Sequence, residues 1–340
     1  MSQLMNKQWI MTSRPADMVA RDNFKFQEVP VPELKDGEML VKNLYMSFDP
    51  TLRAWMNERD TYVKAIAIGE VMRCNAVGEV VESKLDGFEK GDRVMGGIGW
   101  QEYCVTTGEN IMPFQKVPTN VPPTMPLSIL GITGLTAYFG MLDVADLKEG
   151  QTVVVSGAAG ATGSVAAQIA KLKGCTVIGI AGGPVKSKFL TEELGLDHAI
   201  DYKNDDVKAK LKEYCPKGID RYFDNVGGPI LDMVLDRIAL KGKVVLCGAI
   251  SDYNSKDVFG PKNYTRLIVM RGSMQGFIIL DYAKRFPEAI AGLSKWVMEG
   301  KIKFQEDLQE GLENAPEAFQ RIFTGKNIGK QLLKVADPAS

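Results

Sequence analysis

The sequence predicts a two-domain α/β protein, in which a doubly wound parallel sheet accompanies an irregular, mostly antiparallel β domain. Three observations predict this class. At 340 residues the chain is longer than one compact core usually holds, so two domains are expected. Residues 20–125 contain short β-type runs interrupted by Pro and Gly, whereas strands and helices alternate regularly after Gly150.

The irregular domain is predicted from runs such as residues 39–45 and 78–82, which are too short and too often interrupted for regular helices. A cluster of prolines follows these runs, at Pro113, Pro118, Pro122, Pro123 and Pro126. Because proline lacks a backbone N–H and disfavours regular structure, we interpret this stretch as a linker.

The regular part begins with a β-branched run, after which apolar residues recur at helical spacing. The expected strands are residues 153–156, 176–181, 198–202, 221–226 and 243–250. The expected helices lie between them, marked by Val165, Ile169 and Leu172, by residues 186–194, by Val207, Leu211 and Tyr214, and by Ile230, Val234, Leu235 and Ile238. Helices of this length are the crossovers that parallel strands require, which predicts a parallel sheet.

The rest of the chain extends the sheet and then leaves it. The apolar run at residues 267–277 is the expected sixth strand, and an amphipathic helix follows at Phe286, Ile290, Leu293 and Val297. A final strand at residues 330–335 is expected to return to the first domain. The predicted domains are therefore residues 1–128 with 306–340, and residues 129–305.

Composition excludes several classes of function. Forty-one basic residues against forty-two acidic ones give a net charge of −1, so no overall field favours nucleic acid. No apolar run reaches the roughly eighteen residues that a membrane span needs. The chain has one histidine, His198, and its five cysteines are widely spaced without a CxxC pair, which argues against a zinc site. Unpaired cysteines also favour a soluble protein of the reducing cytoplasm.

A glycine-rich turn follows the first strand of the regular part. Gly157, Gly160 and Gly163 form a GxxGxxG pattern between the expected strand and helix. Such glycines let the backbone approach a pyrophosphate, and the helix N-terminus favours its negative charge. The alternative is a plain tight connection, but the strand and helix around the motif favour dinucleotide binding. A P-loop is excluded because the terminal Lys-Ser/Thr pair is missing.

The end of the second strand indicates which dinucleotide binds. An NAD site usually has an acidic residue there, whereas this chain has Gly182, Gly183 and then Lys186. Small residues and a lysine accommodate a ribose phosphate, so NADPH is the expected cofactor. Tyr202, at the end of the third strand, is a second contact to the ribose phosphate or the adenosine ribose or, equally well, a core tyrosine.

A series of motifs along nearly the whole chain resembles the medium-chain dehydrogenase/reductase superfamily, and within it the zinc-independent leukotriene/prostaglandin reductases and curcumin-type alkenal double-bond reductases. The motifs are residues 47–50, 131–138, 159–164, 223–228, 247–254 and 325–330. The resemblance implies a GroES-like substrate domain, an NADPH-binding Rossmann domain, and zinc-free reduction of a C=C bond conjugated to a carbonyl.

The resemblance also implies roles for individual residues. Lys186 and Tyr202 resemble the contacts to the 2′-phosphate, and the turn Gly160-Ala161-Thr162-Gly163 resembles the pyrophosphate site. Residues similar to those around the nicotinamide and its ribose are Asn225, Cys247, Phe277 and Asn327. Thr51 and Thr133 depart from the Tyr and Pro that many relatives have, which leaves the identity of the enone or enal substrate open.

Tyr253 matches the tyrosine held near the substrate carbonyl, and it follows the fifth expected strand, at the edge where α/β sheets bind ligands. A phenol is a neutral donor near pH 7 and can stabilise an oxygen that becomes negative after hydride reaches the β-carbon. Tyr253 or water would then supply the proton at the α-carbon.

Two other functions stay open on the sequence. A quinone oxidoreductase would use the same geometry, because quinones also accept hydride into a conjugated carbonyl, and a non-catalytic NADPH-binding redox sensor would bind the cofactor without turnover. A homodimer is expected from pairing of the edge strand at residues 267–277 with a second copy, since exposed edges favour pairing and the family is often dimeric.

Overall fold

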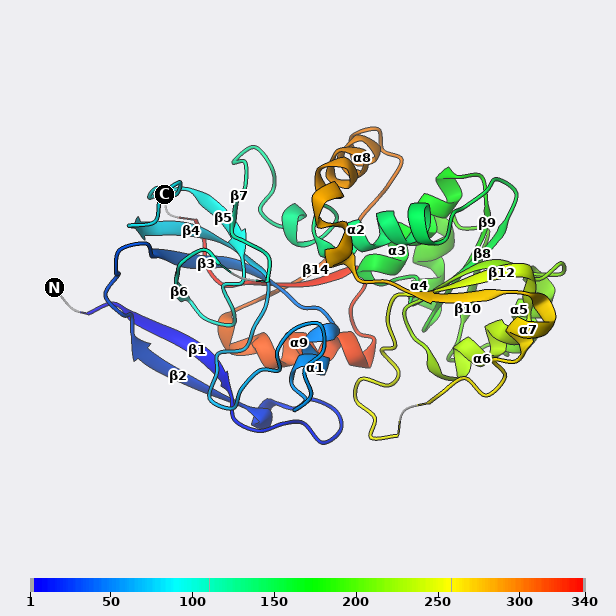
Figure 1. Ribbon diagram of the computed structural model, residues 1–340, viewed down its shortest axis with the longest axis horizontal. Helices are drawn as coiled ribbons and strands as arrows, with labels where there is room; N and C mark the ends of the chain where they lie inside the picture. The colour runs from blue at the N-terminus through cyan, green and yellow to red at the C-terminus, as the bar shows by residue number, and fades with distance from the viewer. Residues whose placement is uncertain (1–2, 110, 258, 339–340) are drawn as a thin grey trace. The chain divides into compact units, whose positions relative to one another are not determined.

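The computed structural model describes residues 3–109, 111–257 and 259–338. The chain divides into two compact units, and the colour of Figure 1 follows the residue number along both. Unit 1 contains Met1–Ser128 and Glu306–Ser340, and unit 2 contains Ile129–Gln305.

Unit 2 is built on a parallel sheet. Its strands lie in the order β10 (His198–Asp201), β9 (Thr176–Ala181), β8 (Thr152–Ser156), β11 (Ile219–Asp224), β12 (Ile238–Leu246) and β13 (Ser273–Gly276). All neighbouring pairs in this order are parallel. The chain winds outward from β8 in one direction and from β11 in the other. The predicted doubly wound sheet is confirmed, and its switch point lies between β8 and β11.

Helices cover both faces of this sheet (Figure 1). One group is α2 (Ile132–Phe139), α3 (Ala161–Leu172) and α8 (Phe286–Met298), with the π-helix η3 (Gly140–Val144) and the 3-10 segment η5 (Ile279–Arg285). The opposite face carries α5 (Val207–Tyr214) and α6 (Gly228–Asp236), while α4 (Pro184–Lys188) and the π-helix η4 (Phe189–Glu193) follow β9. Val165 and Ile169 of the predicted stripe are buried, whereas Leu172, the last residue of α3, is 38% exposed.

The expected strand at residues 267–277 is wrong over its first half, which forms the helix α7 (Arg266–Met270). Leu267 and Met270 lie on one side of this helix and pack against the core beside β12. Arg271 then adopts a left-handed conformation with φ +48°, and the Gly272 N–H donates to the Leu267 carbonyl at 2.9 Å. These contacts end the helix and leave only Ser273–Gly276 as strand β13.

The boundary before β12 was also misplaced by the helical spacing. Ile238 was expected in a helix, but α6 ends at Asp236 and Ile238 starts β12, paired in parallel with Ile219. The strand ends at Leu246 rather than at residue 250, because the N–H groups of Cys247 and Gly248 both donate hydrogen bonds to the Asp224 carbonyl.

Unit 1 contains a mixed sheet with the order β14 (Glu306–Glu310), β15 (Lys330–Lys334), β3 (Met39–Ser47), β4 (Ala76–Ser83), β5 (Arg93–Gly96) and β7 (Gln115–Lys116). β6 (Tyr103–Thr106) also pairs with β3, and β1 (Met5–Met11) and β2 (Phe24–Pro30) form an antiparallel hairpin. The helical elements are α1 (Thr51–Trp55), α9 (Ala315–Thr324) and the 3-10 turns η1 (Arg21–Asn23), η2 (Met125–Leu127) and η6 (Leu312–Asn314).

The C-terminal segment belongs to the core of unit 1. β15 pairs antiparallel with β3, and Phe319 of α9 packs among the buried rings of Phe48 and Trp100. Part of the expected linker is also structured here, since β7 pairs with β5. Within the described residues, no helix has the length and apolar character that crossing a bilayer requires.

Candidate cofactor and active site

The turn after β8 has the geometry of a phosphate cradle. Gly157 adopts φ +57°, and the Gly160 N–H donates back to the Gly157 carbonyl at 2.9 Å. A Cβ on Gly163 would lie 2.3 Å from that same carbonyl oxygen, so only glycine lets α3 pack this closely on the turn. The helix begins at Ala161 without a side-chain cap, and its first N–H groups are therefore available to an anion.

The end of β9 is shaped by glycine and by the neighbouring strand end. A Cβ on Gly182 would lie 2.8 Å from the Tyr202 ring and 3.0 Å from Cε of Lys203. Tyr202 is 47% exposed, so it is a surface residue over this turn rather than a core tyrosine. Gly183, with φ +94°, leads directly into α4, whose first turn carries Lys186.

Lys203 is a residue that the sequence interpretation missed. It follows Tyr202, and the methylene stem of Lys203 shares with the Tyr202 ring the space over Gly182. The signal was available in the sequence, since any cation directly after the third strand must lie at the same sheet edge as the end of the second. Lys186, in the first turn of α4, and Lys203, whose stem lies near Gly182, thus follow the ends of β9 and β10, where an NAD site has an acid.

Asp201 holds this turn in shape. Its Oδ1 accepts the Gly183 N–H at 2.7 Å and the Lys203 N–H at 3.0 Å, and its Oδ2 accepts from the Asn204 amide at 2.7 Å. Burial alone would raise the pKa of Asp201, but these hydrogen bonds outweigh it and hold the pKa below its ordinary value. The Asp201 carboxylate therefore stabilises the turn through hydrogen bonds within the fold.

The ends of β8 and β11 are joined through Asn225. Its side-chain amide donates to the Ser156 carbonyl at 2.7 Å, and its backbone N–H donates to Ser156 Oγ at 3.0 Å. Asn225 is half-buried at the switch point, directly beside the glycine turn, where a Cβ on Gly157 would lie 3.4 Å from the Asn225 Cβ. The structure thus brings Asn225 to the same edge as the predicted phosphate turn.

Cys247 and Tyr253 lie at the end of the next strand, β12. Burial and the nearby charge of Asp224 raise the pKa of the Cys247 thiol to about 12, so the thiol stays protonated near neutral pH. The Tyr253 hydroxyl folds back over the turn and accepts the Ala249 N–H at 3.3 Å. A Cβ on Gly248 would lie 3.3 Å from this hydroxyl oxygen, so the phenol lies directly on the strand end.

Phe277 follows β13 at the same edge. A Cβ on Gly140 would lie 2.8 Å from Cζ of Phe277, and the ring meets Tyr282 edge-on at 6.3 Å between centroids. Tyr282 in turn stacks on Phe139 at 4.6 Å. The half-buried Phe277 is therefore backed by an aromatic stack.

Asn327 belongs to unit 1. It lies between α9 and β15, where its amide donates to the Gly329 carbonyl at 3.0 Å. Two other residues of the family-like motifs pair in this unit, since the buried Lys330 ammonium lies 2.5 Å from the Asp49 carboxylate. Thr51, one of the departures from the family pattern, bonds the Tyr62 hydroxyl at 2.9 Å.

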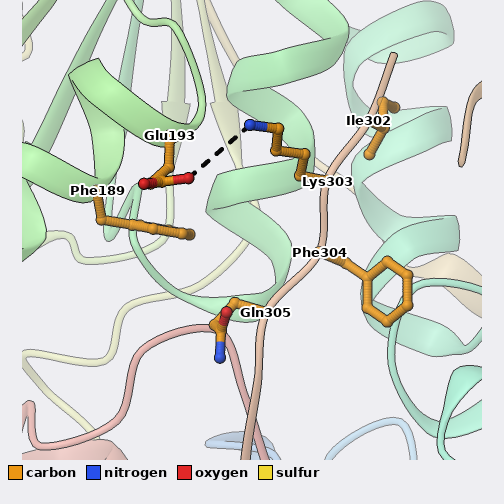
Figure 2. Close-up of a pocket in the computed structure, with 6 residues that line it drawn as sticks. All are labelled: Phe189, Glu193, Ile302, Lys303, Phe304 and Gln305. Carbon is orange, nitrogen blue, oxygen red and sulfur yellow. Dashed lines mark ion pairs between the residues drawn. The ribbon is translucent and has the colours of Figure 1, made fainter. Parts of the chain in front are cut away.

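A separate hollow of about 420 Å³ lies between η4 and the segment that follows α8 (Figure 2). Its lining residues are Phe189, Glu193, Ile302, Lys303, Phe304 and Gln305. Glu193 and Lys303 form an ion pair at 3.8 Å, as the dashed line shows, so their charges compensate each other. None of the residues predicted from the sequence lines this hollow.

The lone histidine and the acidic side chains do not add a metal site. His198 begins β10 and stacks on Tyr214 with 4.0 Å between ring centroids. Among the residues that the structure describes, no three His, Cys, Asp or Glu side chains gather where they could hold an ion.

Comparisons with known proteins match both units. Residues 7–114 match a family described as "N-terminal domain of oxidoreductase", and residues 161–295 match one described as "Zinc-binding dehydrogenase". The NADPH-dependent curcumin reductase of Escherichia coli (strain K12) is 39% identical over 337 residues, covering 97% of each chain. The NADP(+)-dependent 2-alkenal reductase of Nicotiana tabacum is 38% identical over 340 residues, covering 98% of each.

A solved structure agrees with the fold described above. The crystal structure of CurA from Vibrio vulnificus in complex with NADPH has a TM-score of 0.92 and 40% sequence identity, and the match covers 98% of this chain and 100% of that chain. The predicted fold class, a Rossmann sheet with a GroES-like β domain, is confirmed.

Proposed function

This chain belongs to the zinc-independent reductase branch of the medium-chain dehydrogenase/reductase superfamily and is an NADPH-dependent oxidoreductase, and from that premise we propose that it reduces the C=C bond of α,β-unsaturated ketones or aldehydes. In this proposal unit 2 binds NADPH. The names of the curcumin and 2-alkenal reductases support an electron-poor conjugated olefin as the substrate class.

The described residues fit the phosphates of NADPH. The uncapped N-terminus of α3, with Gly160, Ala161, Thr162 and Gly163, would hold the pyrophosphate through backbone N–H groups. The 2′-phosphate would lie against Lys186, Tyr202 and Lys203. The glycine at the end of β9 supports this assignment, because its missing side chain leaves the site without a competing carboxylate.

The nicotinamide half would lie along the ends of β11, β12 and β13. Asn225 and Cys247 follow the first two of these strands, and Phe277 follows the third. The family resemblance also assigns Asn327, a residue of unit 1, to the nicotinamide and its ribose. The raised pKa of Cys247 suits a position beside an electrophilic substrate, because a protonated thiol adds slowly to enones.

The chemistry divides between cofactor and protein. NADPH, when bound, supplies a hydride to the β-carbon of the substrate, and negative charge then collects on the carbonyl oxygen. Tyr253 would stabilise that oxygen by donating a hydrogen bond, since its hydroxyl lies over the turn after β12 at the carboxyl edge of the sheet. A proton from Tyr253 or water at the α-carbon completes the saturated carbonyl product.

One observation carries the proposal: the phosphate turn after β8 and the Tyr253 hydroxyl after β12 lie at the same carboxyl edge of one sheet. The test measures NADPH oxidation with an alkenal, an alkenone and a quinone, with product analysis for the saturated carbonyl. We expect turnover of the enal and the enone. Turnover of the quinone alone would identify a quinone oxidoreductase, and tight NADPH binding without any turnover would identify a redox sensor.

The proposal includes a cytoplasmic homodimer. β13 is the edge strand of its sheet, and beside it α7 exposes Ile268 and Val269, at 74% and 66%. A second copy paired along β13 would cover these side chains and satisfy the unpaired backbone groups of the edge. The five cysteines are free thiols, which suits a reducing compartment.

A further inference from the structure

Asp224, the last residue of β11, accepts four hydrogen bonds at one of its carboxylate oxygens. Its Oδ1 accepts from Ser156 Oγ at 3.0 Å, from the Tyr222 hydroxyl at 2.8 Å, and from the N–H groups of Val226 and Gly227 at 3.0 and 2.9 Å. The residue is fully buried. Its second oxygen, Oδ2, has no hydrogen-bond partner among the described residues.

This arrangement favours an ionised carboxylate over any neutral side chain. A neutral amide oxygen has two lone pairs, whereas four donors around one oxygen are best satisfied by negative charge. Burial raises the pKa of Asp224, and the hydrogen bonds from Gly227, Val226, Tyr222 and Ser156 oppose that effect. A buried charge is costly for stability, so packing alone does not explain its presence.

The contacts of Asp224 converge on the cofactor edge. Ser156, which donates to Asp224, also accepts the backbone N–H of Asn225, while the Asn225 amide donates to the Ser156 carbonyl. The backbone carbonyl of Asp224 accepts from the N–H groups of Cys247 and Gly248 at 2.9 and 3.0 Å. One residue therefore links the ends of β8, β11 and β12.

We propose that Asp224 is a positioning residue for the cofactor, which fixes the Asn225 side chain and the spacing of the strand ends against which the nicotinamide half lies. Asp224 does not touch the cofactor and acts through Asn225 and Ser156. The inference rests on the proposed placement of the nicotinamide half beside Asn225.

The primary test replaces Asp224 by asparagine, which keeps the volume but removes the charge and places an NH₂ group in the buried site. We expect the Kd of NADPH, measured by fluorescence titration, to rise at least fivefold. The Kd of NADH should rise by the same factor, because the nicotinamide half is common to both cofactors. A folded Asp224→Asn protein whose Kd values change less than twofold would overturn the proposal.

Asp220 offers a matched control on the same strand. Its carboxylate accepts the Thr152 N–H at 2.8 Å and so also links β11 to β8, but at the opposite end of the strand pair. We expect Asp220→Asn to leave both Kd values within twofold. An equal loss in both variants would show a general effect of carboxylates on the sheet and would refute the specific role of Asp224.

A double-mutant cycle with Asn225→Ala tests the route of the effect. If Asp224 acts through Asn225, Asp224→Asn should change the NADPH Kd less than twofold in the Asn225→Ala background. Independent, additive losses would refute the inference while leaving the cofactor site intact. An Asn225→Ala variant with unchanged affinity would instead refute the placement of the cofactor, and the inference with it.

Ser156→Ala provides a second variant if Asp224→Asn does not fold. It removes one donor to Asp224 and the acceptor of the Asn225 N–H, and it should show the same weakened binding and the same loss of additivity with Asn225→Ala. Thermal unfolding is measured for every variant. A lower unfolding temperature with unchanged NADPH affinity in Ser156→Ala would identify a merely structural role.

Discussion

Replacing Gly163 by alanine tests the close contact that forms the phosphate cradle. The new Cβ would lie 2.3 Å from the Gly157 carbonyl oxygen and 3.0 Å from Cα of Ala158, both of them backbone atoms of the turn. Real Cβ atoms do not approach others within 3.0 Å, so the helix and the turn must separate by about 0.7 Å. Neither atom belongs to a flexible side chain that could move away at little cost.

The size of the effect follows from that displacement. Forced overpacking of this kind costs about 1–3 kcal/mol of stability, which for a domain of the size of unit 2 lowers the unfolding temperature by roughly 2–12 °C. In enzymes, misplacement of a group on the order of 1 Å lowers the reaction rate about a hundredfold where geometry is critical. We therefore expect the Kd of NADPH to rise by about tenfold or more, and the Kd of NADH to rise equally, because both cofactors contain the pyrophosphate.

The assay combines fluorescence titration with thermal unfolding, and Gly160→Ala is its graded control. A Cβ at Gly160 would lie 3.2 Å from the same carbonyl oxygen, and its backbone conformation suits alanine. We expect the loss of affinity at Gly160 to be several times smaller than at Gly163. Equal losses at the two positions, or none at Gly163, would refute the argument that close packing of α3 forms the site.

Three further predictions concern the reaction, the cofactor preference and the assembly. Tyr253→Phe should keep NADPH affinity but raise the barrier of the chemical step by roughly 3–4 kcal/mol, so that kcat falls. Undiminished turnover of an enone would remove Tyr253 from the mechanism. Lys186→Ala and Lys203→Ala should each weaken NADPH by about tenfold with little change for NADH, and titrations showing equal losses for both cofactors would place the 2′-phosphate elsewhere. Ile268→Asp should convert the proposed dimer to a monomer in light scattering, whereas Met298→Asp, exposed on α8, should not; a wild-type monomer would contradict the dimer.

The sequence predicted best where the signal is local. β9 has the predicted bounds because a β-branched run ends at two glycines, and α3 follows a glycine turn with a clear apolar stripe. The turn and helix also lie next to each other in the chain, so the phosphate cradle follows from a single stretch of sequence. The ends of the remaining strands were predicted only approximately.

Non-local contacts explain what was missed. The run at residues 267–277 is apolar enough for a strand, but Leu267 and Met270 pack as one helical face on the core beside β12. The link between Asp224 and Ser156 joins residues 68 positions apart, which no spacing rule detects. The role proposed for Lys203 depends on its stem lying over Gly182, at the end of the neighbouring strand. In each case tertiary packing decides the outcome.

Two buried carboxylates at the cofactor edge respond to pH in opposite ways. The pKa of Asp201 is lowered in the fold, so the stability that it contributes is present above the unfolded pKa of about 3.9 and is lost as the pH falls through the folded value. The pKa of Asp224 is raised, so the cost of its charge appears as the pH rises from about 3.9 through the folded value. Each carboxylate accepts a hydrogen bond from a backbone N–H group of the fold, from Gly183 for Asp201 and from Gly227 for Asp224. Both carboxylates therefore stabilise the strand ends through hydrogen bonds within the fold, and in our proposal Lys186 and Lys203 determine which dinucleotide binds there.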